Sequence, residues 1–183
     1  FKEILIVADE NTYSAAGEKV KRALSGKKIN EVIFSGKTVL IPDERAIEKV
    51  NENLGSSDLI VAVGSGVIQD LCKYVSKFSS VPYIDVATAP SMDGYASDGA
   101  AMILKGMKET VKAGLPKAII ADTEVLVEAP MEMIKAGYGD IVGKFSALND
   151  WKLSKCVNNE YFCEYIYDLT YSQIQKSLEL ADG

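Results

Sequence analysis

A chain of 183 residues that is 48% hydrophobic can bury a sizeable core in one or two domains. Its net charge of −6, with Arg22 and Arg45 as the only arginines, argues against nucleic-acid binding, because phosphate neutralisation needs clustered basic residues. The longest apolar runs span about five residues, far short of the roughly twenty that a membrane-crossing helix needs.

The first 128 residues alternate short apolar runs with patterns of helical spacing. Apolar runs bounded by turn residues indicate buried strands, and apolar residues three or four positions apart indicate amphipathic helices. We predict strands at residues 4–8, 31–34, 59–63, 83–87 and 117–121. We predict helices at about 13–25, from Pro42-Asp43 onward and at 67–78, and a hairpin over 100–111 that turns at Lys105-Gly106.

Continuous apolar strands separated by helices predict a mostly parallel sheet that is covered on both faces. The pattern changes near Ala129, where Pro130 begins a stretch that is helical throughout. We therefore predict an α/β fold, with a Rossmann-like domain over residues 1–128 and the beginning of an all-helical domain over residues 129–183. Because the chain starts at Phe1, lacks histidine and ends soon after a new amphipathic pattern begins, we expect the C-terminal part of a longer protein to be missing.

The cysteines and the N-terminal residues bear on the cellular compartment. Cys72, Cys156 and Cys163 are an odd number without CxxC spacing, which favours reduced thiols. No basic segment followed by an apolar run opens the chain, so no secretory signal is predicted and we expect a cytoplasmic protein.

Two polar segments follow neighbouring predicted strands. Gly64-Ser65-Gly66 lies where a strand turns directly into a helix, and glycine there permits close approach of a phosphate to free N–H groups. The segment TAPSMDGYAS, Thr88–Ser97, leaves the next strand, and such loops are where open α/β sheets bind ligands. Taken alone, the first also fits a tight turn without a ligand, and the second fits a surface loop with a turn at Asp93-Gly94.

A third segment, Gly137-Tyr-Gly-Asp140, interrupts a helical pattern with two glycines. Each costs about 1 kcal/mol relative to alanine in a helix, which suggests that something approaches the backbone there. An ion pair between Asp140 and Lys144, one turn apart, is the alternative, although it does not explain the glycines.

The strings GSGVIQD (64–70), TAPSMDGYAS (88–97) and AGYGDIVGKFSALNDW (136–151) resemble, in order and spacing, the glycerol-1-phosphate dehydrogenases. These belong to the broader family of glycerol dehydrogenases, iron-containing alcohol dehydrogenases and dehydroquinate synthase. The resemblance runs from about Ile4 to Trp151 and implies a dehydroquinate synthase-like fold and a homo-oligomer. Val67 stands where plain glycerol dehydrogenases carry the lysine of GGGKxxD, which favours the glycerol-1-phosphate branch.

The resemblance implies two sets of cofactor contacts. The turn and first helical residues would bind the pyrophosphate of NAD(H) or NADP(H) and nearby groups, through Gly64, Ser65, Gly66, Val67, Ile68, Gln69 and Asp70. The loop after the next strand would contact the cofactor near its nicotinamide, through Thr88, Ala89, Pro90, Ser91 and Ser97. Asp9, at the end of the first strand, is a candidate for a contact with the adenosine ribose.

The same resemblance implies the catalytic groups. Asp140 would ligate one divalent metal per chain, zinc or nickel, and contact the substrate, while Asp93 would bind substrate hydroxyls. Lys144 is the candidate partner for a substrate phosphate, with a structural ion pair equally open. The two further metal ligands of the family are histidines of its C-terminal domain, and this chain has none.

The implied reaction is the reduction of dihydroxyacetone phosphate to sn-glycerol 1-phosphate and its reverse. The metal would polarise the ketone oxygen and the nicotinamide would carry the hydride. The alternatives are a glycerol or other polyol dehydrogenase, a dehydroquinate synthase-like lyase and a non-catalytic nucleotide-binding regulator. The lyase would also need substrate-binding lysines and arginines that we do not find.

Overall fold

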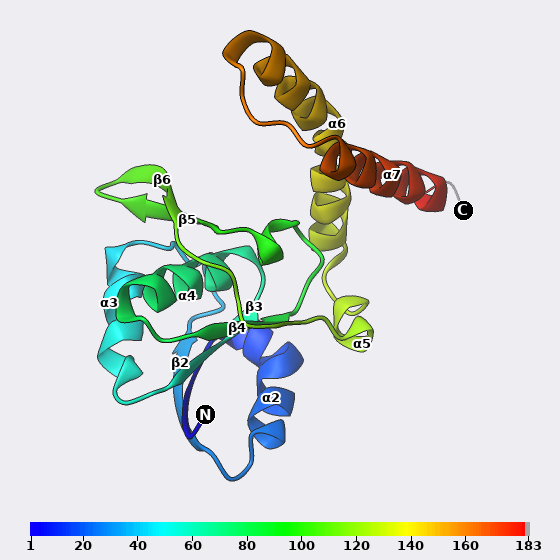
Figure 1. Ribbon diagram of the computed structural model, residues 1–183. Helices are drawn as coiled ribbons and strands as arrows, with labels where there is room; N and C mark the ends of the chain where they lie inside the picture. The colour runs from blue at the N-terminus through cyan, green and yellow to red at the C-terminus, as the bar shows by residue number, and fades with distance from the viewer. Residues whose placement is uncertain (182–183) are drawn as a thin grey trace. The chain divides into compact units, whose positions relative to one another are not determined.

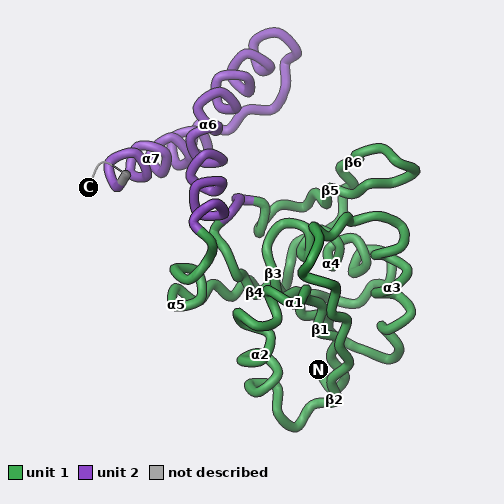
Figure 2. Tube along the Cα trace, turned by 180° about the vertical axis from the view of Figure 1, so that it is seen from behind, with its two compact units in different colours: residues 1–90, 94–130 green, residues 91–93, 131–183 purple. Residues whose placement is uncertain are grey.

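A computed structural model describes residues 1–181 of the chain. These residues form two compact units (Figure 2). Unit 1 comprises Phe1–Pro90 and Gly94–Pro130, and unit 2 comprises Ser91–Asp93 and the described residues from Met131 onward. Three residues of the loop after one strand therefore belong to the helical unit.

Unit 1 is built on a sheet of five parallel strands in the order β2-β1-β3-β4-β7 (Figure 1). The strands are β1 (Glu3–Asp9), β2 (Lys28–Phe34), β3 (Leu59–Gly64), β4 (Tyr83–Ala87) and β7 (Ile119–Ile120). Every residue of the central strand β3 is buried, because helices cover both faces of the sheet, and this explains its continuous apolar run. The predicted parallel α/β sheet is confirmed.

Helices and a hairpin connect the strands. They are α1 (Glu10–Thr12), a π-helical turn (Tyr13–Gly17), α2 (Glu18–Ala23), α3 (Glu44–Leu54), α4 (Gly66–Ser79), α5 (Thr123–Leu126) and the antiparallel pair β5 (Gly99–Leu104) and β6 (Met107–Lys112). The first helix begins three residues before the predicted start. The cause is Asp9, whose side chain accepts hydrogen bonds from the N–H groups of Asn11 and Thr12 and so caps α1 at once.

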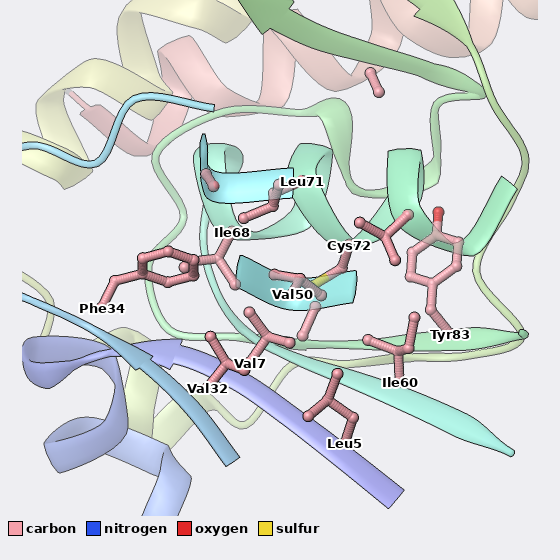
Figure 3. Packing of buried hydrophobic residues seen from close by; sticks show 14 of the residues in the cluster. Leu5, Val7, Val32, Phe34, Val50, Ile60, Ile68, Leu71, Cys72 and Tyr83 are labelled. Atoms are coloured by element: carbon pink, nitrogen blue, oxygen red, sulfur yellow. The ribbon is translucent and has the colours of Figure 1, made fainter. Parts of the chain in front are cut away.

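The sheet has an apolar core on each face. On one face, α3 and α4 pack Val50, Leu71 and Cys72 over strand residues such as Leu5 and Ile60 (Figure 3). A second cluster on the other face joins strand residues to the π-helical turn and α5, through Ile4, Ile6, Ala8, Ala16, Leu59, Val61, Val63, Val86 and Val125. Helix α4 therefore lies directly over the centre of the sheet.

The turn from β3 into α4 is tight. A Cβ atom added to Gly64 would lie 2.7 Å from the Cβ of Ile68, closer than real side chains approach. Ile68 is itself 3% exposed and part of the core, so it has little room to move. Glycine at this position is therefore a packing requirement.

Unit 2 contains two long helices, α6 (Met131–Asn158) and α7 (Glu164–Ala181). The indole Nε1–H of Trp151 donates a 2.8 Å hydrogen bond to the carbonyl oxygen of Tyr161, which fixes the connection between them. Of the two glycines predicted to admit a close neighbour, Gly137 is buried, whereas a Cβ on Gly139 would meet no described atom within 4 Å. No helix in the described part of the chain is long and apolar enough to cross a membrane.

One carboxylate lies in the core of unit 1. Asp85 of β4 is 0% exposed, and neither of its carboxylate oxygens has a hydrogen-bond partner among the described residues. Burial raises the pKa of Asp85 to about 7, while the positive charge of Lys73 opposes this and the charge of Asp70 adds to it. A carboxyl group that is easier to protonate in the folded chain makes stability depend on pH.

The pKa of Asp85 rises from its ordinary 3.8 to about 7 on folding. The folded state therefore keeps this proton over a pH range in which the unfolded state loses it. Stability from this group is complete below about pH 4 and falls by up to about 1.4 kcal/mol per unit until pH 7. We predict that the melting temperature of Asp85→Asn, measured relative to the wild type, rises from pH 4 to pH 7 and is constant above.

The control is Val86→Ala, which removes core volume beside Asp85 and no charge. Its melting temperature should lie below that of the wild type by a similar amount at each pH. A pH-independent difference for Asp85→Asn would contradict the raised pKa.

Candidate functional site

The carboxyl ends of β1, β3 and β4 lie at one edge of the sheet. Successive connections run from β1 to β2 on one side and then to β3 on the other side of β1. This reversal is the topological switch point at which open α/β sheets bind ligands. Asp9 ends β1, Gly64 ends β3 and Ala87 ends β4, so the predicted polar segments begin at this edge.

Helix α4 differs from α3 in how its N-terminus is capped. The side chain of Asp43 caps α3 by accepting from the N–H groups of Arg45 and Ala46. Ser65 is the N-cap of α4, yet among the described residues its side chain makes no capping hydrogen bond. The first N–H groups of a 14-residue helix are thus left to other acceptors, at the positive end of its dipole.

The side chains of Ile68, Gln69 and Asp70, which follow in α4, have different environments. The side chain of Ile68 lies in the apolar core, so a ligand could reach this residue only through its backbone. Gln69 is 1% exposed, and its Nε2 donates to the Gly64 carbonyl oxygen at 3.5 Å. Burial raises the pKa of Asp70, and the charge of Lys73 opposes that shift.

The loop after β4 is joined to the glycine turn and braced internally. The N–H of Thr88 donates to the Gly64 carbonyl oxygen at 3.2 Å, which links the two predicted segments directly. The Tyr95 hydroxyl donates to the Ala89 carbonyl oxygen at 2.7 Å, and burial, with a smaller effect of the charge of Asp85, raises the pKa of Tyr95 to about 12. The loop therefore has a fixed shape, with Thr88 buried and Ser97 exposed.

Unit 2 brings three predicted site residues together. The N–H of Asp93 donates to Oδ2 of Asp140 at 2.9 Å. The Lys144 ammonium lies between the carboxylates, 3.0 Å from Oδ2 of Asp93 and 3.1 Å from Oδ1 of Asp140. The predicted pairing of Asp140 with Lys144 is present, and it includes Asp93 as well.

These contacts determine the charge states of the cluster. Partial burial acts to raise the pKa of Asp140, but hydrogen bonds from Lys144 and from the Asp93 N–H outweigh it, and the net pKa is lowered. Partial burial acts to lower the pKa of Lys144, and the two carboxylates reverse this and raise it. The cluster is thus one ammonium between two carboxylates.

The described residues do not by themselves complete a metal site. Among them, no group of three or more histidine, cysteine, aspartate or glutamate side chains is placed to hold a metal ion. Asp140 offers one carboxylate where catalytic zinc sites typically use three protein ligands. Cys72, Cys156 and Cys163 are free thiols, and Cys72 is buried.

Sequence reasoning did not identify Lys73, Asp85 or Tyr95. The signal for Asp85 was available, since a carboxylate inside the apolar run Tyr83–Ala87 is costly unless it has a purpose. Lys73 lies three residues after Asp70 on α4, a spacing that placed it beside a site residue. Asp9 was identified, and its Oδ1 is used to cap α1.

Comparison with known proteins finds curated relatives over nearly the whole chain. Glycerol-1-phosphate dehydrogenase (NAD(P)+) of Geobacillus thermodenitrificans is 38% identical over 98% of this chain and 46% of its own length. The enzyme of that name from Methanosarcina mazei is 35% identical over 98% of this chain and 50% of its own length. The chain thus spans about half the length of these curated relatives.

Solved structures share the fold. A probable glycerol dehydrogenase from Sinorhizobium meliloti matches 85% of this chain and 42% of its own, with a TM-score of 0.73 and 23% identity. A 2-deoxy-scyllo-inosose synthase matches 78% of this chain and 41% of its own, with a TM-score of 0.65 and 22% identity, so the dehydroquinate synthase-like fold is confirmed. A family model described as iron-containing alcohol dehydrogenase matches residues 1–130, and the chain belongs to that family.

Proposed function

We propose that this chain supplies the nucleotide-binding half of an NAD(P)H-dependent dehydrogenase that reduces dihydroxyacetone phosphate to sn-glycerol 1-phosphate and catalyses the reverse oxidation. The observation that carries the proposal is the hydrogen bond from Thr88 to Gly64, which joins the glycine turn to the polar loop at the switch point of the sheet. The names of the curated relatives support the choice of reaction. We also propose a cytoplasmic protein from its cysteine pattern and, from the resemblance, a homo-oligomer.

The proposed cofactor contacts lie in unit 1. The turn from β3 into α4 and the first residues of α4, Gly64 to Asp70, bind the pyrophosphate of NAD(H) or NADP(H), because the first N–H groups of α4 have no side-chain cap in the described structure. The polar loop residues bind near the nicotinamide, namely Thr88, Ala89, Pro90, Ser91 and Ser97. Asp9 contacts the adenosine ribose through the carboxylate oxygen that does not cap α1.

The proposed substrate contacts lie in unit 2. Asp93 binds a substrate hydroxyl, and Asp140 binds the substrate and one divalent metal, whose remaining ligands come from outside these 183 residues. Two carboxylates and one ammonium carry a net charge of −1, so Lys144 alone would not attract a phosphate ester. A divalent zinc or nickel ion would reverse that charge and polarise the substrate carbonyl as a Lewis acid.

The first prediction concerns the pyrophosphate. Gly66→Val places a branched side chain at the first residue of α4, among the backbone groups proposed to bind phosphate. NADH affinity of the protein expressed from the complete coding sequence should fall by about tenfold or more, since charge-assisted hydrogen bonds are lost. Titration of nicotinamide fluorescence measures it.

Gly114→Val is the matched control, because a Cβ at Gly114 would meet no described atom within 4 Å. It should bind NADH as the wild type does. Melting temperatures of both variants separate lost binding from lost folding. Wild-type affinity in a folded Gly66→Val protein would refute the assignment of this turn.

The second prediction concerns the metal. The protein from the complete coding sequence should retain about one zinc or nickel ion per chain after dialysis, and Asp140→Asn should lose it, because one of the few ligands is removed. Residues 1–183 expressed alone should bind either ion weakly. Asp150→Asn, at an exposed position of the same helix, is the control and should keep the metal. Normal metal content and turnover in Asp140→Asn would exclude it as a ligand.

The third prediction concerns the substrate. With NADH or NADPH, kcat/KM for dihydroxyacetone phosphate should exceed that for dihydroxyacetone by at least about a hundredfold, because a site built to pair a phosphate leaves polar groups unsatisfied without it. Asp93→Ala should raise KM for the ketone by about tenfold while NADH affinity is kept. Oxidation of the cofactor and stereochemical typing of the product measure this. A preference for dihydroxyacetone would instead indicate a polyol dehydrogenase.

A further inference from the structure

Lys73 is a buried cation that the proposed reaction has not used. Its side chain is 0% exposed, and it lies on α4 beside residues of the apolar core. Its ammonium donates to the carbonyl oxygens of Gly94 at 3.2 Å and Gly99 at 3.1 Å, and to Oγ of Ser97 at 3.2 Å. All three partners lie in residues 94–99, which comprise the end of the loop after β4 and the first residue of β5.

The three hydrogen bonds account for the whole donor capacity of an ammonium group. A lysine ammonium has three N–H donors and no acceptor. A buried charge of this kind is strongly destabilising unless it is fully hydrogen-bonded. Lys73 meets that condition through residues 94–99, and Asp70 adds an ion pair at 3.7 Å, so the hydrogen bonds of the ammonium are lost if this segment moves away.

Charge neutralisation in the core is the alternative role for Lys73. Asp70 Oδ1 lies 3.7 Å from the Lys73 Nζ, beyond hydrogen-bond distance. The charge of Lys73 acts to lower the pKa of Asp85, yet neither carboxylate oxygen of Asp85 has a hydrogen-bond partner in the described chain. The directional contacts of Lys73 therefore go to residues 94–99, whereas its effect on Asp85 is only through charge.

We infer that Lys73 is a positioning residue that fastens residues 94–99 to α4. The loop after β4 and the N-terminus of α4 are then held in fixed positions relative to each other, so that both contact the nucleotide. Ser97, a proposed cofactor contact, is one of the fastened groups. Gly66 begins the same helix, two turns before Lys73. The inference rests on the proposed function, because it supposes that a nucleotide lies against both segments.

Three variants of the protein from the complete coding sequence test the inference. Lys73→Met removes the ammonium. The double variant Lys73→Met/Asp85→Asn removes the fully buried carboxylate together with the ammonium and leaves only the partly exposed Asp70 without its ionic partner, so it should fold even where the single variant does not. Lys77→Met, at an exposed position of the same helix, is the matched control. Two properties are measured: hydrogen exchange of the peptide that covers residues 91–99 without nucleotide, and the Kd for NADH together with kcat at saturating NADH.

In both Lys73 variants we expect exchange in residues 94–99 to accelerate and the Kd for NADH to rise, each by about tenfold, as the loss of a charged hydrogen bond implies. The kcat at saturating NADH should change less than Kd, and Lys77→Met should match the wild type in all three. Recovery of slow exchange and wild-type affinity in the double variant would overturn the inference, because Lys73 would then serve only to balance Asp85.

Wild-type affinity in a variant whose loop exchanges faster would also overturn it. Failure of the proposed function gives a different result: the unaltered protein would not bind NADH. In that case the hydrogen-exchange measurement, which needs no nucleotide, would still show whether Lys73 fastens the loop. The role of Lys73 in cofactor binding would be refuted.

Discussion

The parallel pairing of β3 with β4 is the constraint on which the rest of unit 1 depends. In this register Gly64 lies opposite Ala87, so both strands end at the same level of the sheet. The N–H of Thr88 continues the pairing by one more bond to Gly64. A helix start and a polar loop are thereby placed side by side, as the proposed nucleotide site requires. Packing of Ile68 against Gly64 then fixes α4 over the same edge.

The sheet could be predicted from the sequence because strands that are buried on both faces have continuous apolar runs, such as Leu59–Val63. Lys73 could not be identified in this way, since a lysine on an amphipathic helix ordinarily lies in water, and only the fold reveals three acceptors around it. The contact of Asp93 with Asp140 was equally hidden, because 47 residues separate them and no local pattern records the pairing. The motifs suggested the residues of the site, whereas their partners required the structure.

The two proposed binding regions differ in how they treat charge. In unit 1 the anion would meet backbone N–H groups and small hydroxyls, with the lysine turned inward to hold the loop. In unit 2 the lysine lies between carboxylates and leaves the cluster negative. The two phosphates would therefore be recognised differently. Backbone N–H dipoles would bind the cofactor phosphates, and an added cation would be needed to bind the substrate phosphate.

The assignment of Ser91–Asp93 to the helical unit has a consequence for modularity. The chain crosses between the units at Pro90, at Gly94 and again after Pro130, so a cut after Pro130 releases unit 1 only together with Ser91–Asp93. A recombination or engineered exchange that transplants the nucleotide half must carry Asp93 with it. The proposed cofactor contacts and the proposed substrate hydroxyl contact would then be transferred together.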